Sequence, residues 1–268
     1  MKHDEFLRKH PVFTIAEFSL HLSSQGDVGS RAEESLLAYY QKTGKVIRIQ
    51  RGLYAVIPPG SDPDSYPVDP FLIAGKLTSD AVISHHSALE FHGYAYSIQE
   101  QFTYLATHPL RPLTYRAHSF RGTKFPVALL RTGKEKYGVI RADRAGMDIH
   151  VTNLERTLVD VLDRPQFSGS WEEIWRSLGA VEFFDLDVVI EYTHLLGNAT
   201  TGAKVGFFLQ QRRESLMVEE HHLNKLRSLR PRQPHYLDRT KRQSGRFIPE
   251  WNLIVPQEVY EQAWGEVV

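Results

Sequence analysis

The residues with the clearest chemical potential are three histidines that lie close together in the sequence, His85, His86 and His92. Zinc-binding helices usually offer ligands four residues apart, and His86 and Glu90 have that spacing. The other histidines form no second cluster with recognisable ligand spacing, and the chain has no cysteine. We therefore expect these histidines to cap a helix or pack in the core, and we expect neither a metal nor another cofactor.

Two pairs of carboxylates are the next candidates, Asp160 with Asp163 and Asp185 with Asp187. A nuclease needs clustered carboxylates together with a lysine, to hold a metal ion and activate a water molecule. Both pairs sit at helical positions without a nearby lysine, and the chain has no Walker sequence, nucleotide-binding glycine loop or nucleophile elbow. The sequence predicts no catalytic residue and favours a protein that is not an enzyme. A metal-dependent hydrolase of nucleic acid or nucleotides, built on the C-terminal domain, is the alternative.

The composition is that of a globular protein with about two domains. The chain has 268 residues, of which 41% are hydrophobic and 24% charged. Without cysteine, disulfides and thiol nucleophiles are excluded. No apolar run has the length of a membrane span, and the first ten residues do not resemble a signal peptide. We expect a cytoplasmic protein that does not contact a membrane.

The formal net charge is zero, with 32 basic and 32 acidic residues, but the charge is unevenly distributed. Residues 204–246 contain 11 lysines and arginines against 4 acidic residues. The apolar residues Val205, Phe208 and Leu209 have the spacing of a helix core, which leaves the cations, Lys204 among them, facing outward. This stretch is either a solvated basic surface or a second contact to nucleic-acid phosphate. The residues expected to make such a contact are Arg212, Arg213, Arg230 and Arg232.

The first sixty residues indicate two helices separated by a short turn. Thr14 and Glu17 form a capping box for a helix that ends near Ser24, and Ser30 and Glu33 repeat this pattern for a second helix of three to four turns. Gly44 ends the second helix. A helix, a turn containing glycine and a second helix are the layout of a helix-turn-helix.

The second helix has an apolar and a polar face, and a hairpin follows it. Two extended runs, 46–49 and 53–56, are joined by Gln50-Arg51-Gly52 and predict the hairpin. A helix-turn-helix followed by a hairpin with Arg48 and Arg51 near its tip is a winged helix. The second helix would enter the DNA major groove while these arginines reach phosphates or the minor groove. The same layout also serves as a packing module, so a protein-interaction scaffold is a further alternative. The apolar arc contains Ala32, Leu36, Leu37, Tyr39 and Tyr40, and the opposite arc contains Arg31, Glu34, Ser35, Ala38, Gln41 and Lys42.

The remaining sequence predicts a mixed domain. The fold class is therefore α+β, with an N-terminal winged helix-turn-helix in residues 1–60 and a larger mixed α+β domain in residues 61–268. A linker rich in proline, glycine and aspartate covers 57–64. Helices are predicted at 70–76, as a short capped helix within 84–93, from capping boxes at Thr152 and Ser170, and at 185–196, 200–212 and 219–229; strands are predicted at 102–105, 127–130 and 149–151.

Taken in order, several segments resemble the AbiEi-type antitoxins, the transcriptional-regulator halves of abortive-infection (type IV) toxin–antitoxin pairs. The resemblance spans nearly the whole chain, and its most specific parts are Arg51-Gly52-Leu53-Tyr54 and Glu155-Arg156-Thr157-Leu158-Val159-Asp160. The other segments are Ser84-His85-His86-Ser87-Ala88-Leu89-Glu90-Phe91-His92-Gly93, Gly206-Phe207-Phe208-Leu209 and Trp251-Asn252-Leu253-Ile254-Val255-Pro256.

The resemblance implies a winged helix that represses its own operon by binding repeats in double-stranded promoter DNA. It implies that the larger domain provides the antitoxin activity. The functional partner is a nucleotidyltransferase-like toxin that the antitoxin need not touch. The resemblance transfers no catalytic motif and leaves the operator sequence and the oligomeric state open. Carried onto this chain, the expected DNA contacts are Arg31, Ser35, Gln41, Lys42, Arg48 and Arg51.

Overall fold

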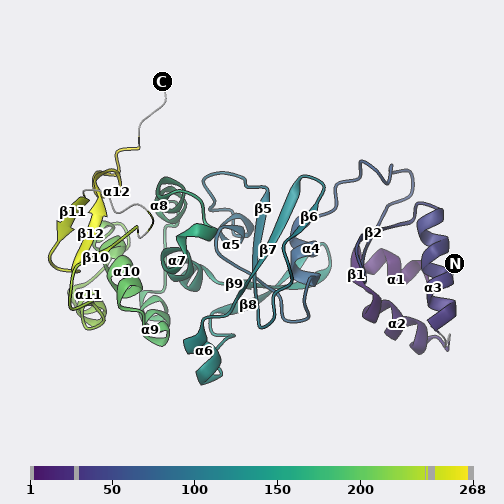
Figure 1. Ribbon diagram of the computed structural model, residues 1–268, viewed down its shortest axis with the longest axis horizontal. Helices are drawn as coiled ribbons and strands as arrows, with labels where there is room; N and C mark the ends of the chain where they lie inside the picture. The colour runs from purple at the N-terminus through teal and green to yellow at the C-terminus, as the bar shows by residue number, and fades with distance from the viewer. Residues whose placement is uncertain (1–2, 27–29, 239, 241–244, 265–268) are drawn as a thin grey trace.

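Three regions follow one another along the chain and lie in the same order along the long axis of the molecule (Figure 1). The computed structural model describes residues 3–26, 30–238, 240 and 245–264. Within these residues we distinguish an N-terminal unit (up to residue 57), a sheet region (58–152) and a helical region (from 153). The expected mixed α+β architecture is confirmed.

The N-terminal unit combines helices with a three-stranded antiparallel sheet of order β1-β3-β2. The two predicted helices and the predicted hairpin are present as α2, α3, β2 and β3. The first helix and the first strand were not anticipated. The bounds are α1 Asp4–Lys9, β1 Val12–Thr14, α2 Ile15–Ser24, α3 Ser30–Lys42, β2 Val46–Gln50 and β3 Leu53–Val56.

The predicted capping box of α2 is confirmed. The Thr14 hydroxyl accepts from the Glu17 amide (3.3 Å), and the Glu17 carboxylate accepts from the Thr14 amide (2.8 Å). The predicted contact between Phe13 and Phe18 is also present, with ring centroids 5.6 Å apart. These contacts fix the direction in which the chain enters α2. Residues 27–29, where the turn after α2 was expected, lie outside the described residues.

Helix α3 packs through a narrower apolar stripe than the sequence predicts. Leu37 and Tyr40 are buried and Leu36 is half-buried, but Tyr39 is 48% exposed, so its expected place in the apolar arc is wrong. Residues 37 and 40 lie one turn apart and suffice to hold the helix on its core. Glu33, expected to cap α3, accepts a hydrogen bond from Ser19 of α2 (2.6 Å) and so links the two helices.

A six-stranded mixed sheet of order β6-β7-β5-β4-β9-β8 forms the sheet region. The strands predicted at 102–105 and 149–151 and the helices predicted at 70–76 and within 84–93 are present. The bounds are α4 Pro70–Lys76, β4 Val82–Ile83, α5 His86–Phe91, β5 Gln101–Ala106, β6 Leu113–Tyr115, β7 His118–Lys124, α6 Val127–Thr132, β8 Val139–Arg144 and β9 Met147–Thr152.

The N-terminal unit shares a hydrophobic core with the sheet region. Val12, Leu53 and Ala55 of its sheet belong to the same buried cluster as Phe71 and Leu72 of α4. Alternate residues of β5 and β9 complete this cluster from the other side of α4, as the period of two in a strand requires. Helix α4 therefore lies between the two sheets, and the N-terminal unit is packed against the sheet region in addition to being linked to it.

The strand predicted at 127–130 is wrong, because these residues form helix α6. Pro126 precedes the helix with a φ of −53°, and Gly133 ends it in the left-handed conformation with a φ of 65°. Only Leu129 is buried, whereas Val127 is 60% exposed. A short apolar run does not distinguish strand from helix, and here the flanking proline and glycine decide.

Two predicted helix starts differ in detail. Helix α5 has no side-chain cap, because its N-cap is His85 with a φ of 54° and the neighbouring Ser84 hydroxyl lies 2.9 Å from His85 Nδ1. Helix α7 is capped by Asn153, which accepts from the Arg156 amide, and not by Thr152. Thr152 ends β9, and its hydroxyl is buried 2.7 Å from that of Thr157. In both cases the hydroxyl near the helix start, that of Ser84 or Thr152, contacts a neighbouring side chain and not the helix amides.

The helical region confirms the predicted helices and adds a small three-stranded sheet of order β10-β12-β11. Ser170 caps its helix by accepting from the Glu173 amide (3.1 Å). The Glu173 carboxylate, however, turns away from Ser170 toward other partners. The bounds are α7 Leu154–Asp163, a 3₁₀ helix Pro165–Phe167, α8 Trp171–Gly179, α9 Leu186–Leu196, α10 Ala199–Gln211, α11 Glu220–Arg227, β10 His235–Tyr236, β11 Gly245–Ile248, β12 Leu253–Pro256 and α12 Gln257–Glu261.

A buried ionic cluster lies where α7 meets α9. The Arg156 guanidinium is fully buried; its Nε donates to Asp160 (3.2 Å) and its Nη1 to the Glu135 carbonyl (2.7 Å). The Tyr192 hydroxyl donates to the other Asp160 oxygen (2.6 Å). Burial, together with the Asp160 carboxylate, raises the pKa of Tyr192 well above its usual value, so it remains a donor. Buried charges need such partners, and removing one partner is costly.

Replacing Tyr192 with phenylalanine should therefore destabilise the protein by about 1–3 kcal/mol, because Asp160 would lose a buried donor. Tyr137 is the matched control, since its ring stacks on Tyr192 but its hydroxyl donates to the exposed Glu191. Tyr137→Phe should cost less than about 0.5 kcal/mol. Urea denaturation of both variants measures the difference, and equal losses would contradict a structural role for this cluster.

Candidate nucleic-acid interface

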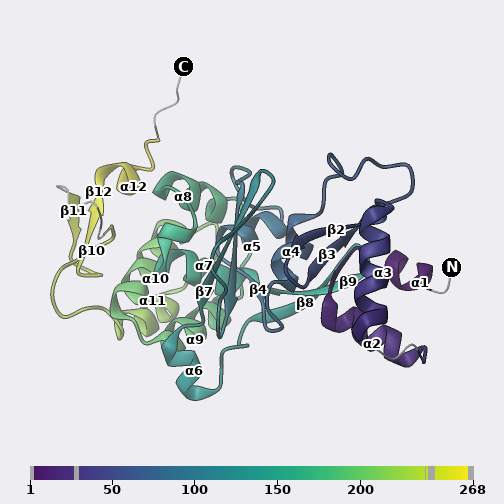
Figure 2. The same cartoon turned by 45° about the vertical axis from the view of Figure 1, so that its right-hand side comes forward.

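Helix α3 lies at the end of the molecule opposite the helical region in both views (Figures 1 and 2). Its side chains Ser35, Gln41 and Lys42 are exposed, as the sequence predicts for a reading face. Leu37 and Tyr40 hold the other side of the helix on the core of the N-terminal unit. Neither the sheet region nor the helical region buries these three polar side chains.

The β2–β3 hairpin brings Arg48 and Arg51 to the surface beside α3. Both side chains are exposed, and Arg48 Nε donates to the Gln50 carbonyl (3.3 Å). Gly52 closes the turn with a φ of 81°, a conformation that favours glycine. The Gly52 carbonyl accepts from the Ile15 amide (2.8 Å), which ties the hairpin tip to the first turn of α2. The hairpin is therefore short and held in place.

Three of the expected contacts, Lys42, Arg48 and Arg51, are cations that form no ion pair with any described residue. The ion pairs of the N-terminal unit involve Lys9, Lys45 and Lys76 instead. Unpaired exposed cations can exchange their counter-ions for nucleic-acid phosphates. Glu34, on the same helix, is exposed and opposes such a contact. Arg31 belongs to α3, but its side chain lies outside the described residues.

No pattern in the sequence identifies the residue that links this surface to the rest of the molecule. Lys76 of α4 forms an ion pair with Glu17, the carboxylate that caps α2. Burial alone would raise the pKa of Glu17, but hydrogen bonds from Lys76 and Thr14 outweigh it, and the pKa lies below its usual value. The capping box predicted that Glu17 is important for α2, but nothing in the sequence pairs it with a lysine 59 residues away.

The four arginines proposed as secondary phosphate contacts are not assembled into one free patch. Arg212 donates to the Gly179 carbonyl (2.8 Å) at the end of α8, and Arg213 pairs with Glu220 (3.3 Å). Arg230 donates to a backbone carbonyl at residue 250 (3.3 Å). Arg232 is exposed. Three of the four thus make intramolecular contacts.

Of the three clustered histidines, His85 and His86 are buried, as the sequence predicts, and His92 is half-buried. Burial, together with the nearby Arg164 cation, lowers the pKa of His85 to about 3, so its ring is neutral at pH 7. His86 Nε2 lies 3.0 Å from the buried Glu173 carboxylate, and His92 Nε2 lies 2.8 Å from the Thr152 carbonyl. Among the described residues, no three histidines or carboxylates are grouped to hold a metal ion.

Two predictions are wrong at Lys204: that its side chain faces outward, and that no lysine lies near the carboxylate pairs. It does not face outward, because its side chain is only 5% exposed, and its Nζ donates to the Leu162 carbonyl (2.9 Å) and lies over the Trp171 ring. A cation at that position satisfies a carbonyl at the C-terminal end of α7. Lys204 also lines the same cavity as Asp163, so one of the carboxylate pairs has a lysine nearby after all.

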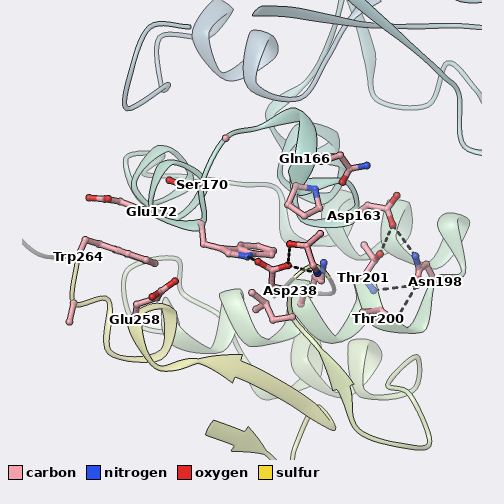
Figure 3. Close-up of a pocket in the computed structure, with 17 residues that line it drawn as sticks. Asp163, Gln166, Ser170, Glu172, Asn198, Thr200, Thr201, Asp238, Glu258 and Trp264 are labelled. Atoms are coloured by element: carbon pink, nitrogen blue, oxygen red, sulfur yellow. Dashed lines mark hydrogen bonds between the residues drawn. The ribbon is translucent and has the colours of Figure 1, made fainter. Parts of the chain in front are cut away.

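That cavity, of about 710 Å³, lies between α7, α8, α10 and α12 (Figure 3). Two of its carboxylates, Asp163 and Asp238, accept hydrogen bonds from neighbouring side chains. Asp163 accepts from Asn198 (2.9 Å) and Thr201 (2.5 Å), and Asp238 accepts from Trp171 Nε1 (3.0 Å). These two carboxylates therefore link neighbouring elements around the cavity, and the described residues of the cavity include no group of three that could hold a metal ion.

No family model matches the chain, and no curated protein matches it. The fold resembles a solved structure, the RV2827C protein from Mycobacterium tuberculosis, with a TM-score of 0.59 and 17% sequence identity. The match covers 96% of this chain and 90% of that protein. At this identity the similarity concerns the fold alone. Within the described residues, no helix has the length and hydrophobicity of a membrane span.

Replacing Lys76 with glutamine should destabilise the protein at neutral pH, because Glu17 would keep its partly buried charge without its cation. A carboxylate with a lowered pKa stabilises the folded state above its unfolded pKa, and this contribution is lost as the pH falls. The difference from wild type should therefore shrink as the pH falls below the ordinary glutamate value of 4.5.

Urea denaturation at neutral and acidic pH measures this effect. Lys9→Gln is the control, since Lys9 and Glu5 form an exposed pair of the same type, with side chains 63% and 69% exposed. A destabilisation by Lys76→Gln that is the same at both pH values would show that the Glu17 charge is not involved.

Proposed function

We propose that this chain is a sequence-specific DNA-binding repressor that acts as the antitoxin of a type IV, AbiE-like toxin–antitoxin system in the cytoplasm. The observation that carries the DNA-binding part is the exposed surface of α3 and the β2–β3 hairpin. It combines Lys42, Arg48 and Arg51, which form no ion pair with any described residue, with the exposed polar side chains Ser35 and Gln41 of α3.

We further propose that the N-terminal unit is a winged helix. Its order of elements, helix, strand, two helices and a hairpin, supports this assignment. In this arrangement α3 enters the major groove, where Ser35 and Gln41 can reach base edges. Arg48 and Arg51 then contact phosphates or the minor groove and set the position of α3 on the duplex.

The antitoxin assignment rests on the sequence resemblance, and the structure explains some of the residues that carry it. Gly52 permits the hairpin turn, while Leu53 and Tyr54 are buried beside it. Arg156 and Asp160 form the buried ionic cluster under α9. These residues maintain the fold, which agrees with a regulator that has no catalytic site. The hydrolase alternative is less well supported, because Asp163 and Asp238 of the cavity between α7, α8, α10 and α12 already accept hydrogen bonds from neighbouring side chains.

Wild-type protein should bind its own promoter DNA more tightly than random DNA of equal length, with log affinity falling linearly against log salt concentration. Arg48→Ala and Arg51→Ala should weaken binding to all sequences alike and reduce the salt slope by about one each if each contacts one phosphate. Gln41→Ala should change the base preference. Fluorescence anisotropy with labelled duplexes measures all three effects.

Lys225→Ala is the matched control, because it removes an exposed cation that is paired with Asp187, far from α3 in the sequence. It should leave both affinity and salt slope unchanged. If promoter DNA binds no better than random DNA, or if Lys225→Ala weakens binding as much as Arg51→Ala does, the proposed interface is wrong.

The antitoxin activity has its own test. Co-expression of this chain should restore the growth of cells that produce a nucleotidyltransferase-like toxin encoded by the neighbouring gene. Because the resemblance implies that the larger domain provides this activity, Arg48→Ala together with Arg51→Ala should still restore growth. Failure of the wild-type chain to protect would refute the antitoxin role and leave the DNA-binding proposal standing.

A further inference from the structure

The loop between α5 and β5, residues 94–100, is fixed by side chains from α8. Glu173, only 7% exposed, accepts from both the amide and the hydroxyl of Ser97 (3.1 and 2.6 Å). Ser177, one turn further along α8, accepts from the Tyr96 amide (2.9 Å). His86 Nε2 also lies 3.0 Å from Glu173, so the carboxylate connects α5, the loop and α8. The backbone of this loop is therefore rigid although the loop lies at the surface.

The rigid loop holds two large apolar side chains in solvent. Ile98 is 89% exposed, the highest value among the exposed large hydrophobic residues of the described chain, and Tyr96 is 57% exposed. A single exposed apolar residue needs no explanation. Here, however, the loop is held by a buried carboxylate, so these side chains cannot turn inward without breaking that network. A rigid apolar projection also loses little conformational entropy when a partner covers it.

A groove of about 430 Å³ lies directly beside the loop and shares Tyr96 with it. Its other walls include Trp175 of α8, Arg212 and Trp264. The Arg176 guanidinium also lines the groove and lies 4.8 Å from the centre of the Tyr96 ring. Tryptophan, tyrosine and arginine are the residues that most often dominate the binding energy of protein interfaces.

We propose that this face is the contact between two copies of the chain, in which Ile98 of each copy enters the groove of the other. A projection beside a groove on one face is self-complementary about a two-fold axis, which is the symmetry of most homodimers. The charges are complementary as well. The groove carries two guanidinium groups, Arg212 and Arg176, and Arg176 also pairs with Glu172 of its own chain (2.8 Å). The loop ends in the exposed carboxylate Glu100, which would lie against this cationic wall of the partner in the dimer.

The proposed dimer interface does not depend on the proposed DNA-binding function. It also leaves the exposed surface of α3 and the β2–β3 hairpin uncovered. Helices α8 and α12, which flank the groove, lie away from α3 in both views (Figures 1 and 2). A dimer formed through this face therefore keeps both copies of α3 uncovered. If the chain binds DNA, such a dimer would present two reading helices to a site with two-fold symmetry.

Sedimentation equilibrium of the full-length protein tests the proposal, over concentrations up to about 100 µM. Wild type should dimerise, and Ile98→Asp should weaken the dimer at least about tenfold, because a carboxylate cannot be buried in the groove without cost. Ile98 is exposed, so this variant should keep the thermal stability of wild type. Leu20→Asp is the matched control, since Leu20 is 74% exposed but belongs to α2, which lies at the other end of the molecule from α8 (Figure 1).

A charge reversal tests the contact of Glu100 with the cationic wall of the groove. Glu100→Arg should weaken the dimer, because it places a cation against Arg176 and Arg212, and the neutral Glu100→Gln should weaken it less. A wild-type chain that stays monomeric at about 100 µM overturns the proposal and leaves a different protein as the occupant of the groove. Dimerisation that Ile98→Asp and Leu20→Asp affect equally also overturns it. Neither result depends on whether the chain binds DNA.

Discussion

The packing of the N-terminal sheet against α4 is the constraint on which the rest of the structure depends. Val12, Leu53 and Ala55 share a buried cluster with Phe71 and Leu72. Helix α4 therefore shields this face of the three-stranded sheet from solvent. The position of α3 follows from it, because α3 packs on the opposite side of the same unit through Leu37 and Tyr40. The ion pair between Glu17 and Lys76 adds a directional contact at the edge of this apolar surface. Any ligand that α3 binds is therefore held in a fixed orientation relative to the larger part of the chain.

The polar residues that first suggested chemistry are mostly used to assemble the larger part of the molecule. His86 joins α5 to α8 through Glu173, and Asp160 joins α7 to α9 through Arg156 and Tyr192. Buried polar groups need partners, and hydrogen bonds between helices favour one arrangement of these helices over others. A cluster of histidines or carboxylates in a sequence is therefore compatible with a purely structural role.

Local signals in the sequence predicted the elements well where the chemistry of a helix end is itself local. Thr14, Asn153 and Ser170 each cap a helix within one residue of the expected place, and Gly44 follows the end of α3 as expected. The predictions from sequence are wrong where long-range packing determines whether a side chain is buried. Tyr39 has the spacing of a core residue but α3 needs only a narrow stripe, and the buried position of Lys204 depends on the end of α7, 42 residues away. The candidate residues of α3 and the hairpin follow from helical periodicity, from the hairpin pattern and from the resemblance to AbiEi-type antitoxins. The ion pair between Glu17 and Lys76 follows from none of these.

Hydrogen exchange of the backbone amides, measured with and without promoter DNA, tests the central claim most directly. If α3 and the β2–β3 hairpin form the nucleic-acid interface, promoter DNA should slow exchange in residues 33–56 and leave the helices around the large cavity unchanged. Slower exchange confined to α8, α10 and α12, with α3 unaffected, would place the ligand on the helical region and contradict the account.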